Sequence, residues 1–347
     1  MTISKGIYQR SPAPADTFGV TVPADFGRAV PTDFGRTVVT GGCGFIGSHL
    51  VTRLAQRGVE TVVVDAREPA SPVPGADYVI ADLRALDQAR DALHGANVIF
   101  HLAGTLDAPG SILDPATDFE ANVVTTLNVL RGAEAAGVRR FVFTSSALVY
   151  GSPRSCPVDE DAPPQPVFPY AESKYACERL IASCGKAHQM SYVIGRAFVT
   201  YGPGEPTTAR AEVSQYLRAL ISGAGPHVLG DPDAKTRDFI HVFDVVEALM
   251  TLAASPVTGI VNIGTGRETT LRKLTEIAAT ALRRPVPDLP WEPSPEDEYR
   301  LVADITRLKA LGFRPSISLE DGVAALAEGL SCLAPPLAEP ARGAVPA

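Results

Sequence analysis

The chain lacks any uninterrupted apolar segment of about 18 residues, the length that a membrane-spanning helix needs. Its first 20 residues also lack the apolar centre of a signal peptide. There is no basic run either, because 31 Lys and Arg stand against 39 Asp and Glu, for a net charge of −8. A nucleic-acid site needs a concentrated positive patch. We therefore expect neither a membrane nor a nucleic acid as a partner.

Cysteine is sparse and shows no spacing typical of a metal site. The chain has five cysteines, an odd number, and no CxxC pair. A disulfide framework and a zinc site are therefore not expected, and the pattern predicts reduced thiols in a cytoplasmic protein without a metal.

The two ends of the chain differ in composition from the rest. Residues 1–36 are rich in Pro, Gly and Ala and contain a short duplication, residues 22–28 followed by 30–36. No helical or strand period persists there, so we expect a disordered leader. The Pro- and Ala-rich residues 334–347 are expected to be a disordered tail.

Between these ends, strand-like and helical patterns alternate. Such a rhythm of apolar strands predicts an α/β fold with a parallel sheet covered by helices on both faces. From about Gly202 the pattern is less regular, and this later part is expected to hold the substrate. The strand-like runs are residues 37–39, 61–65, 98–102, 140–144 and 191–194, and helical periods include 121–136 and 173–184.

A glycine-rich segment, residues 40–47, follows the first apolar run and leads into a helical pattern. Gly41 allows a tight strand-to-helix turn, Gly44 lets the backbone approach a pyrophosphate, and Gly47 permits close packing of the helix on the strand. The phosphates would lie at the positive end of that helix. This arrangement predicts a dinucleotide site.

The second apolar run ends in Asp65, 24 residues after Gly41. An acid at this position accepts hydrogen bonds from the adenosine ribose and repels a 2′-phosphate, which favours NAD over NADP. Arg67, two residues on, would partly offset that repulsion. A turn or cap role for Asp65 is the structural alternative, but it does not account for the spacing.

Tyr170 and Lys174 are four residues apart at the start of a helical pattern, which places them on one helix face. A neighbouring ammonium stabilises a phenolate, and a nicotinamide cation would add to that effect, so we expect the pKa of Tyr170 to fall toward neutrality, as suits a general base. Ser146 ends the strand-like run before them, where a hydroxyl would reach into the ligand crevice. The alternatives are a solvated Tyr–Lys pair and a serine that caps a turn.

The ordered motifs of the chain resemble those of the extended short-chain dehydrogenase/reductases, and more narrowly the NAD-dependent nucleotide-sugar epimerases and dehydratases. The resemblance covers residues 37–328. It implies a Rossmann-type doubly wound parallel sheet over 37–198, with a smaller C-terminal substrate-binding α/β domain over 199–333, of which 237–264 would return to the first domain. The matching motifs are TGGCGFIG, Asp65, ADL at 81–83, HLAG at 101–104, Asn122-Val123, SS and VYG at 145–151, YAESK at 170–174, RAF at 196–198, YGPG at 201–204, TRDFIHV at 236–242, NIGTG at 262–266 and LGF at 311–313.

The resemblance also implies a role for each matching residue. Tyr170 would be the acid/base, Lys174 would orient the nicotinamide ribose, and Ser146 would bind the sugar oxygen. The pyrophosphate would be held by Gly41, Gly44, Phe45, Ile46 and Gly47, and the adenosine ribose by Asp65. Asp82 and Leu83 would lie beside the adenine, and Leu102 and Ala103 would line the cofactor.

On the substrate side, Arg237 resembles the family's contact to the diphosphate of the nucleotide; a surface ion pair with Asp238 or Asp244 is the alternative. Val199 stands where the family has Asn. The family's Arg ahead of a Gly-Asp pair is replaced around residues 294–297, and Arg300 is the substitute that we expect. The residues expected in the loop over the sugar are Thr200, Thr207, Thr208 and Arg210, and a basic residue there would suit a uronic acid.

Two apolar residues narrow the reaction. Family dehydratases and decarboxylases carry acids just after the catalytic hydroxyl, whereas this chain has Ala147 and Leu148. The resemblance therefore implies an NAD-dependent UDP-sugar C4 epimerase working through a transient 4-keto sugar. A 4-ketoreductase is the alternative and a non-catalytic NAD sensor a remote one. Family members commonly form homodimers through two helices, here expected over residues 119–136 and 173–187.

Overall fold

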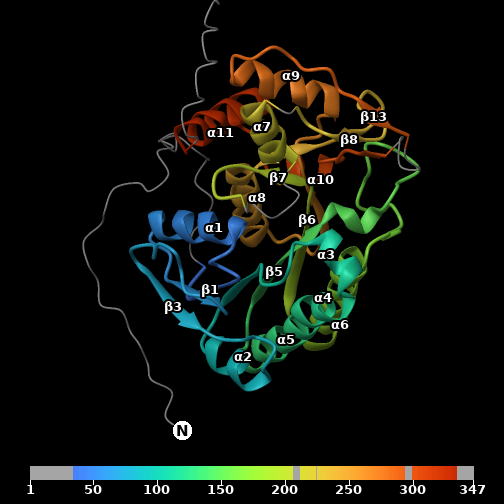
Figure 1. The fold of residues 1–347 in the computed structure, drawn as a ribbon. Helices are drawn as coiled ribbons and strands as arrows, with labels where there is room; N and C mark the ends of the chain where they lie inside the picture. The colour runs from blue at the N-terminus through green and yellow to red at the C-terminus, as the bar shows by residue number, and fades with distance from the viewer. Residues whose placement is uncertain (1–33, 206–211, 224, 294–298, 334–347) are drawn as a thin grey trace, which may run out of the picture.

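The computed structural model describes residues 34–205, 212–223, 225–293 and 299–333, with residues 331–333 described by their backbone alone. A seven-stranded sheet in which every pair is parallel crosses the molecule in the order β11-β6-β5-β4-β1-β2-β3 (Figure 1). The chain winds outward in both directions from β1 and β4, so the switch point lies between these two strands. The strands are β1 (Thr37–Thr40), β2 (Thr61–Asp65), β3 (Ala76–Ile80), β4 (Val98–His101), β5 (Arg140–Ser146), β6 (Ser191–Ala197) and β11 (Gly259–Ile263).

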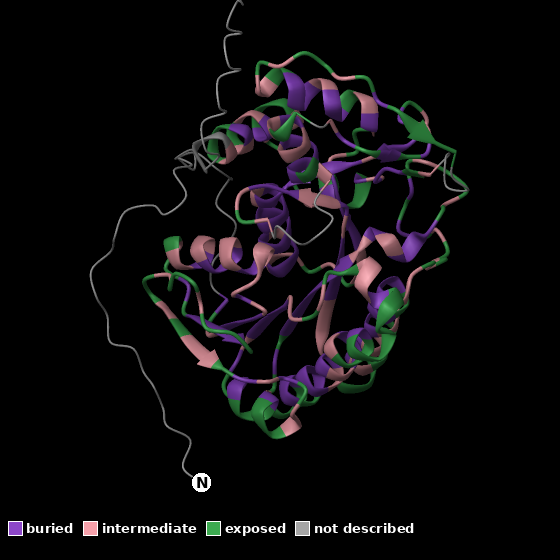
Figure 2. Ribbon diagram, in the orientation of Figure 1, coloured by how far each residue is buried: buried purple, intermediate pink, exposed green. Residues whose placement is uncertain are grey.

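Helices cover both faces of this sheet, which confirms the doubly wound fold. One face packs against α1 (Phe45–Gln56) and α8 (Val242–Ala254), and the other against α2 (Leu86–Ala92), α5 (Thr125–Ala136) and α6 (Pro169–His188) (Figure 1). Successive residues of a strand point to opposite faces. Val39 and Val63 accordingly join one apolar core and Val38 and Val62 the other. The central strands are buried, whereas the edge strand β3 and the outer helix faces are partly exposed (Figure 2).

The later part of the chain builds a smaller α/β unit with its own apolar core, which includes Leu217, Leu274 and Val323. Its helices are α7 (Glu212–Ser222), α9 (Leu271–Ala281) and α11 (Leu319–Leu333), whereas α10 (Thr306–Ala310) packs on β11 of the large sheet. Short sheets pair β7 (Val199–Tyr201) with β10 (Phe239–His241), β8 (Val228–Leu229) with β13 (Trp291–Glu292), and β9 (Thr236–Arg237) with both β12 (Thr269–Thr270) and β14 (Arg300–Leu301). From β10 the chain returns through α8 to β11, which lies beside β6 in the large sheet.

Packed structure already exists at the first described residues. Phe34 is buried with its ring edge-on to that of Phe100, at 6.2 Å between centroids. Arg36 pairs with Glu60 at 3.0 Å. The rest of the expected leader and the whole expected tail lie outside the described residues. Among the helices that are described, none is long and apolar enough to cross a membrane.

The helix expected over 121–136 differs in its first turns. After α3 (Ala108–Leu113) and α4 (Pro115–Phe119), residues Glu120–Val124 form a π-helix that continues into α5. A π-turn adds one residue per turn and is frequent at functional sites. Strand β3 was also missed, because its half-exposed residues show no apolar run.

Candidate active site and cofactor cradle

The glycine-rich turn after β1 is shaped by backbone contacts that leave no room for side chains. Gly41 has φ +71°, and a Cβ there would lie 2.6 Å from the amide nitrogen of Ala103. A Cβ on Gly47 would lie 2.2 Å from the carbonyl oxygen of Gly41. Helix α1 begins at Phe45 with Gly44 as N-cap and without a side-chain cap. The N–H groups of the first turn, which include those of Ile46 and Gly47, are therefore open to an anion such as a pyrophosphate.

Asp65 lies at the carboxyl end of β2, beside this turn. Its Oδ2 accepts the N–H of Cys43 at 3.0 Å and its Oδ1 accepts the N–H of Arg67 at 3.0 Å. Each carboxylate oxygen keeps a lone pair that a ribose hydroxyl can use. Burial raises the pKa of the Cys43 thiol to about 11, and the negative charge of Asp65 adds to the effect. The group beside the expected ribose is therefore a neutral thiol, and the cradle fits NAD.

The other residues expected around the cofactor follow β3 and β4 at the same sheet edge. Asp82 is bound side-on by Arg84, with Nη2 to Oδ2 at 2.7 Å, and this hydrogen bonding lowers the pKa of Asp82. Leu83 is buried. The N–H of Leu102 donates to the Thr40 carbonyl at 3.0 Å, and that of Ala103 to the Thr40 hydroxyl at 3.3 Å.

The structure brings Ser146, Tyr170 and Lys174 together. Ser146 ends β5 and caps a 3₁₀ turn over Ala147–Tyr150 by accepting the N–H of Leu148 at 3.2 Å. Tyr170 lies in the first turn of α6, is buried, and shares a side-chain hydrogen bond with Ser146. Lys174, one turn further on, is also buried, with its Nζ 4.3 Å from the centre of the Phe143 ring. Ser146 is thus both a cap and part of this cluster, and the Tyr–Lys pair is not on a solvated face.

The groups of the protein alone do not lower the pKa of Tyr170. Burial raises the pKa of Tyr170 above its ordinary value, and the hydrogen bond from Ser146 only partly opposes this. Burial also lowers the pKa of Lys174. The free energy needed to remove the phenolate from water exceeds the stabilisation that the neighbouring groups give it. With the groups of the protein alone Tyr170 is therefore a neutral phenol, and the expected fall of its pKa depends on the positive charge of the nicotinamide.

A buried polar network behind Tyr170 was not expected from the sequence. The Asp118 carboxylate accepts hydrogen bonds from Ser173 at 2.6 Å and from Thr105 at 2.7 Å. Asn122, in the π-helix, donates to Asp118 at 3.1 Å and to Ser173 at 3.0 Å. The network fixes the start of α6 against the π-helix, and therefore the position of Tyr170. Asn122 was visible in a motif, but no spacing indicated this role.

A second buried contact connects α6 to the catalytic strand. Glu178, four residues after Lys174, pairs with Arg196 of β6 at 2.7 Å, and the side chains are only 2% and 1% exposed. The Ser145 hydroxyl donates to Glu178 at 2.6 Å. The spacing of Tyr170, Lys174 and Glu178 was a signal that all three share one helix face.

The candidate substrate residues are more scattered. Arg237 pairs with Glu212 at 3.6 Å, and neither Asp238 nor Asp244 is its partner. Asp238 is instead buried and accepts the N–H groups of Thr265, Gly266 and Ala303, and Asp244 accepts those of Ser316 and Ile317.

Two other candidates are described and three are not. Thr200 lies in β7 and donates to the Phe198 carbonyl at 3.1 Å. Arg300 is paired with Glu268 at 2.7 Å and lies opposite Thr236 in the β14–β9 register, so its side chain leaves the sheet on the face opposite to that of Arg237. Thr207, Thr208 and Arg210, like the altered segment 294–297, lie outside the described residues.

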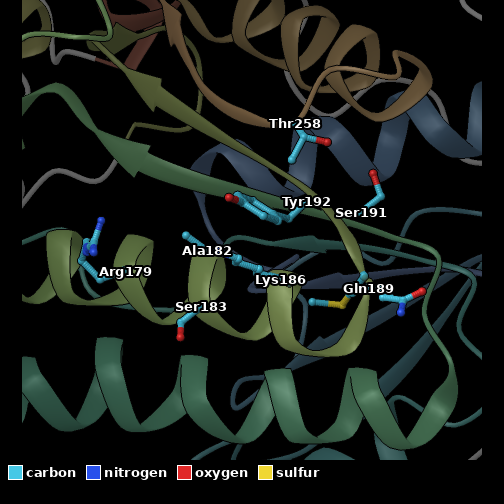
Figure 3. Close-up of a pocket in the computed structure, with 10 residues that line it drawn as sticks. Arg179, Ala182, Ser183, Lys186, Gln189, Ser191, Tyr192 and Thr258 are labelled. Atoms are coloured by element: carbon cyan, nitrogen blue, oxygen red, sulfur yellow. The ribbon is translucent and has the colours of Figure 1, made fainter.

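A cavity in the described part of the chain lies away from these residues. It has a volume of about 740 Å³ and lies between α6 and β6, with Arg179, Lys186 and Tyr192 in its lining (Figure 3). None of the predicted site residues lines it. The residues gathered at the carboxyl edge of the sheet are therefore a better candidate for the reaction than this cavity.

Comparison with known proteins agrees with the geometry. A profile of the NAD dependent epimerase/dehydratase family matches residues 37–264. The chain belongs to this family. It is 35% identical over 308 residues to a UDP-glucose 4-epimerase of Mycolicibacterium smegmatis, covering 84% of this chain and 96% of the relative. It is 32% identical over 291 residues to a putative UDP-glucose 4-epimerase of Methanocaldococcus jannaschii, covering 82% and 95%.

Solved structures of similar proteins contain the expected cofactor. The UDP-glucose 4-epimerase of Thermus thermophilus in complex with NAD matches with a TM-score of 0.77 and 30% identity, over 85% of this chain and 99% of that one. MoeE5 in complex with UDP-glucuronic acid and NAD matches with a TM-score of 0.78 and 31% identity, over 86% and 100%. The cofactor of this family member is NAD.

Proposed function

We propose that this enzyme is a nucleotide-sugar 4-epimerase that acts on a UDP-sugar through a transient 4-keto intermediate. The observation that carries the proposal is the cluster of half-buried Ser146 with buried Tyr170 and Lys174 at the edge of an NAD cradle. The identity of about a third to UDP-glucose 4-epimerases supports it. UDP-glucose and UDP-glucuronate are the substrates to test first, because similar structures hold them.

The residues of the cluster divide the proton chemistry at the sugar. NAD, when bound, supplies the hydride acceptor and donor for the sugar carbon. Tyr170 would take the proton from the sugar hydroxyl and later return it, while Ser146 would hold that oxygen by a hydrogen bond. Lys174 would orient the nicotinamide ribose, and its charge would stabilise the phenolate as Tyr170 loses its proton.

The rest of the site favours a reversible redox step at one carbon. Ala147 and Leu148 are beside Ser146 and carry no exchangeable proton, so an elimination step has no acid at this position. Arg237 would grip the diphosphate, since a guanidinium binds phosphate oxygens in a bidentate way. The enzyme would then keep the nucleotide sugar bound by its diphosphate while the 4-keto sugar turns its other face toward the cofactor.

A turnover assay without added cofactor tests the proposal. Purified enzyme is incubated with UDP-glucose, UDP-galactose and UDP-glucuronate, and the sugars are resolved by proton NMR. We expect an epimer from at least one of them and a loss of at least about 10³-fold in Tyr170→Phe, which removes the acid/base hydroxyl. If no sugar is converted but a 4-keto sugar nucleotide oxidises NADH, the enzyme is a ketoreductase. If neither occurs although NAD binds, the chain is an NAD sensor.

We also propose that the enzyme is a cytoplasmic homodimer joined through α5 and α6. The two helices pack side by side on one face of the sheet (Figure 1). A groove of about 240 Å³ between them is lined by apolar and charged side chains that include Leu127, Leu130, Arg131, Cys184 and His188. A helix pair from a second copy would fill such a groove.

A further inference from the structure

One side of the Arg237 guanidinium is held by two backbone carbonyl groups and an aromatic ring. Its Nη1 donates to the carbonyl oxygens of Thr236 at 3.0 Å and Tyr299 at 3.3 Å. Its guanidinium lies over the Tyr299 ring, with Cζ 4.6 Å from the ring centre. The side chain is 13% exposed, so the fork is fixed before any ligand arrives. What remains for an anion is the edge that carries Nε.

That edge already faces an acid of this chain. Glu212, in the first turn of α7, has its Oε2 3.6 Å from Arg237 Nε. This separation exceeds a hydrogen bond. The same Oε2 is buried and accepts no hydrogen bond from any residue in the described part of the chain. A buried carboxylate oxygen without a hydrogen-bond donor destabilises the protein. Separating Glu212 from Arg237 would therefore cost little free energy.

A second carboxylate lies in the same neighbourhood. Glu205 accepts a hydrogen bond from the Ser214 hydroxyl. Burial raises the pKa of Glu205 to about 7, and the charge of Glu212 contributes to the rise. The surroundings of Arg237 are therefore poor in water and already carry negative charge. A diphosphate entering here meets repulsion from Glu212 as well as attraction to Arg237.

We propose that Glu212 is an internal counter-ion that occupies Arg237 in the absence of substrate and is displaced when the diphosphate of the nucleotide sugar binds. The inference rests on the proposed function, because it assigns that diphosphate to Arg237. Glu212 thereby sets the affinity of the site: it neutralises a buried guanidinium in the free enzyme and weakens the grip on both substrate and product. It is a residue that sets affinity, and it takes no part in the proton transfer.

Binding of UDP and of inorganic pyrophosphate to matched variants tests this. Isothermal titration calorimetry compares wild type, Glu212→Gln, Glu212→Ala and Arg237→Gln. We expect both Glu212 variants to bind UDP about tenfold more tightly than wild type, a change of about 1.4 kcal/mol. Arg237→Gln should abolish the gain when combined with Glu212→Gln. Glu276→Gln makes the same charge change at an exposed pair with Lys273 on α9 and should leave the affinity within about twofold.

Kinetics separate the counter-ion role from a structural one. With a converted sugar nucleotide, Glu212→Gln should lower KM about tenfold without raising kcat, because substrate and product are held equally more tightly. If Glu212 merely positioned Arg237, both variants would bind UDP more weakly than wild type, and the inference would be wrong.

The two proposals fail in different ways. If the Glu212 variants bind UDP or pyrophosphate more tightly but no sugar is converted, the counter-ion proposal is supported and the proposed epimerase activity is wrong. If wild type converts a sugar but the variants bind UDP and pyrophosphate equally or more weakly, the epimerase proposal is supported and the counter-ion proposal is wrong. An absence of UDP and pyrophosphate binding in all variants overturns the counter-ion as well.

Discussion

Burial acts against ionisation at the catalytic side chains Tyr170 and Lys174. It raises the pKa of Tyr170 and lowers that of Lys174, so both groups are less charged than in water. The same burial excludes water from the place where a proton must move. Deprotonation of Tyr170 therefore depends on further positive charge at the site, and the sequence alone, which shows only the spacing of Tyr and Lys, could not reveal this balance.

Glu205 makes the stability of the enzyme depend on pH. Its pKa is raised from 4.5 to about 7, chiefly by burial, while Arg218 opposes and Glu212 adds to the shift. A folded-state pKa above the unfolded value means that the folded state holds the proton more tightly. The stabilisation is therefore complete below about pH 4.5 and is lost as the pH rises through 7. We expect this loss to be about 2 kcal/mol between pH 5 and pH 8.

Urea unfolding at pH 5 and pH 8 checks this expectation. Wild type should lose more stability over this interval than Glu205→Gln, whose amide does not titrate. Equal losses in the two proteins would mean that Glu205 is as readily ionised in the folded as in the unfolded chain.

Helix α6 is the element that organises the site. Tyr170, Lys174 and Glu178 follow one another at four-residue spacing on its buried face. Glu178 ties that face to β6 through Arg196 and to β5 through Ser145, the neighbour of Ser146. The helix, the catalytic strand and the next strand are thus locked in one register.

Breaking the Glu178–Arg196 pair should destabilise the enzyme strongly. Glu178→Ala leaves a buried guanidinium without its partner, which costs about 3–5 kcal/mol. Replacing both residues by Met should recover much of that loss, since no unpaired charge remains buried. The exposed pair of Arg300 with Glu268 is the control, and Glu268→Ala should cost at most about 1 kcal/mol. Urea midpoints measure all four proteins. A double variant no more stable than Glu178→Ala would contradict the reasoning.

Elements built from local patterns could be predicted, and those built from distant contacts could not. The five apolar runs became β1, β2, β4, β5 and β6 because each is buried on both faces. The π-helix at Glu120–Val124 has no such signature. It depends on Asn122 reaching Ser173, 51 residues away. Likewise Arg237 pairs with Glu212, not with the acids nearest to it in sequence.

At the scale of the whole molecule, helix α1, which follows the glycine-rich turn, contacts the later part of the chain that is expected to bind the substrate. His49 of α1 shares a hydrogen bond with the Pro203 carbonyl at 2.8 Å. Arg53 and Arg57, further along α1, pair with Glu247 of α8 at 2.5 and 3.0 Å. A sequence pattern shows α1 and residues 201–204 as separate motifs. They meet because β7, which directly follows β6 of the large sheet, contacts α8, and α8 packs against α1.

The proposed homodimer gives a prediction at this scale. Two copies of a 36.5 kDa chain have a mass of 73 kDa, twice the first value. We expect wild type to show this mass in size-exclusion chromatography with light scattering. Leu127→Glu places a charge in the groove between α5 and α6, where an unpaired charge cannot be buried cheaply, and should give a folded monomer.

Val286→Glu is the matched control, because Val286 is an exposed apolar residue that lies outside α5 and α6. It should leave the dimer intact. A wild-type mass of one chain would exclude the dimer, and a dimeric Leu127→Glu would place the interface elsewhere. Because Tyr170 and Lys174 belong to α6, a dimer joined through that helix would also stiffen the catalytic face. The monomeric variant should therefore lose activity at a lower temperature than wild type and Val286→Glu.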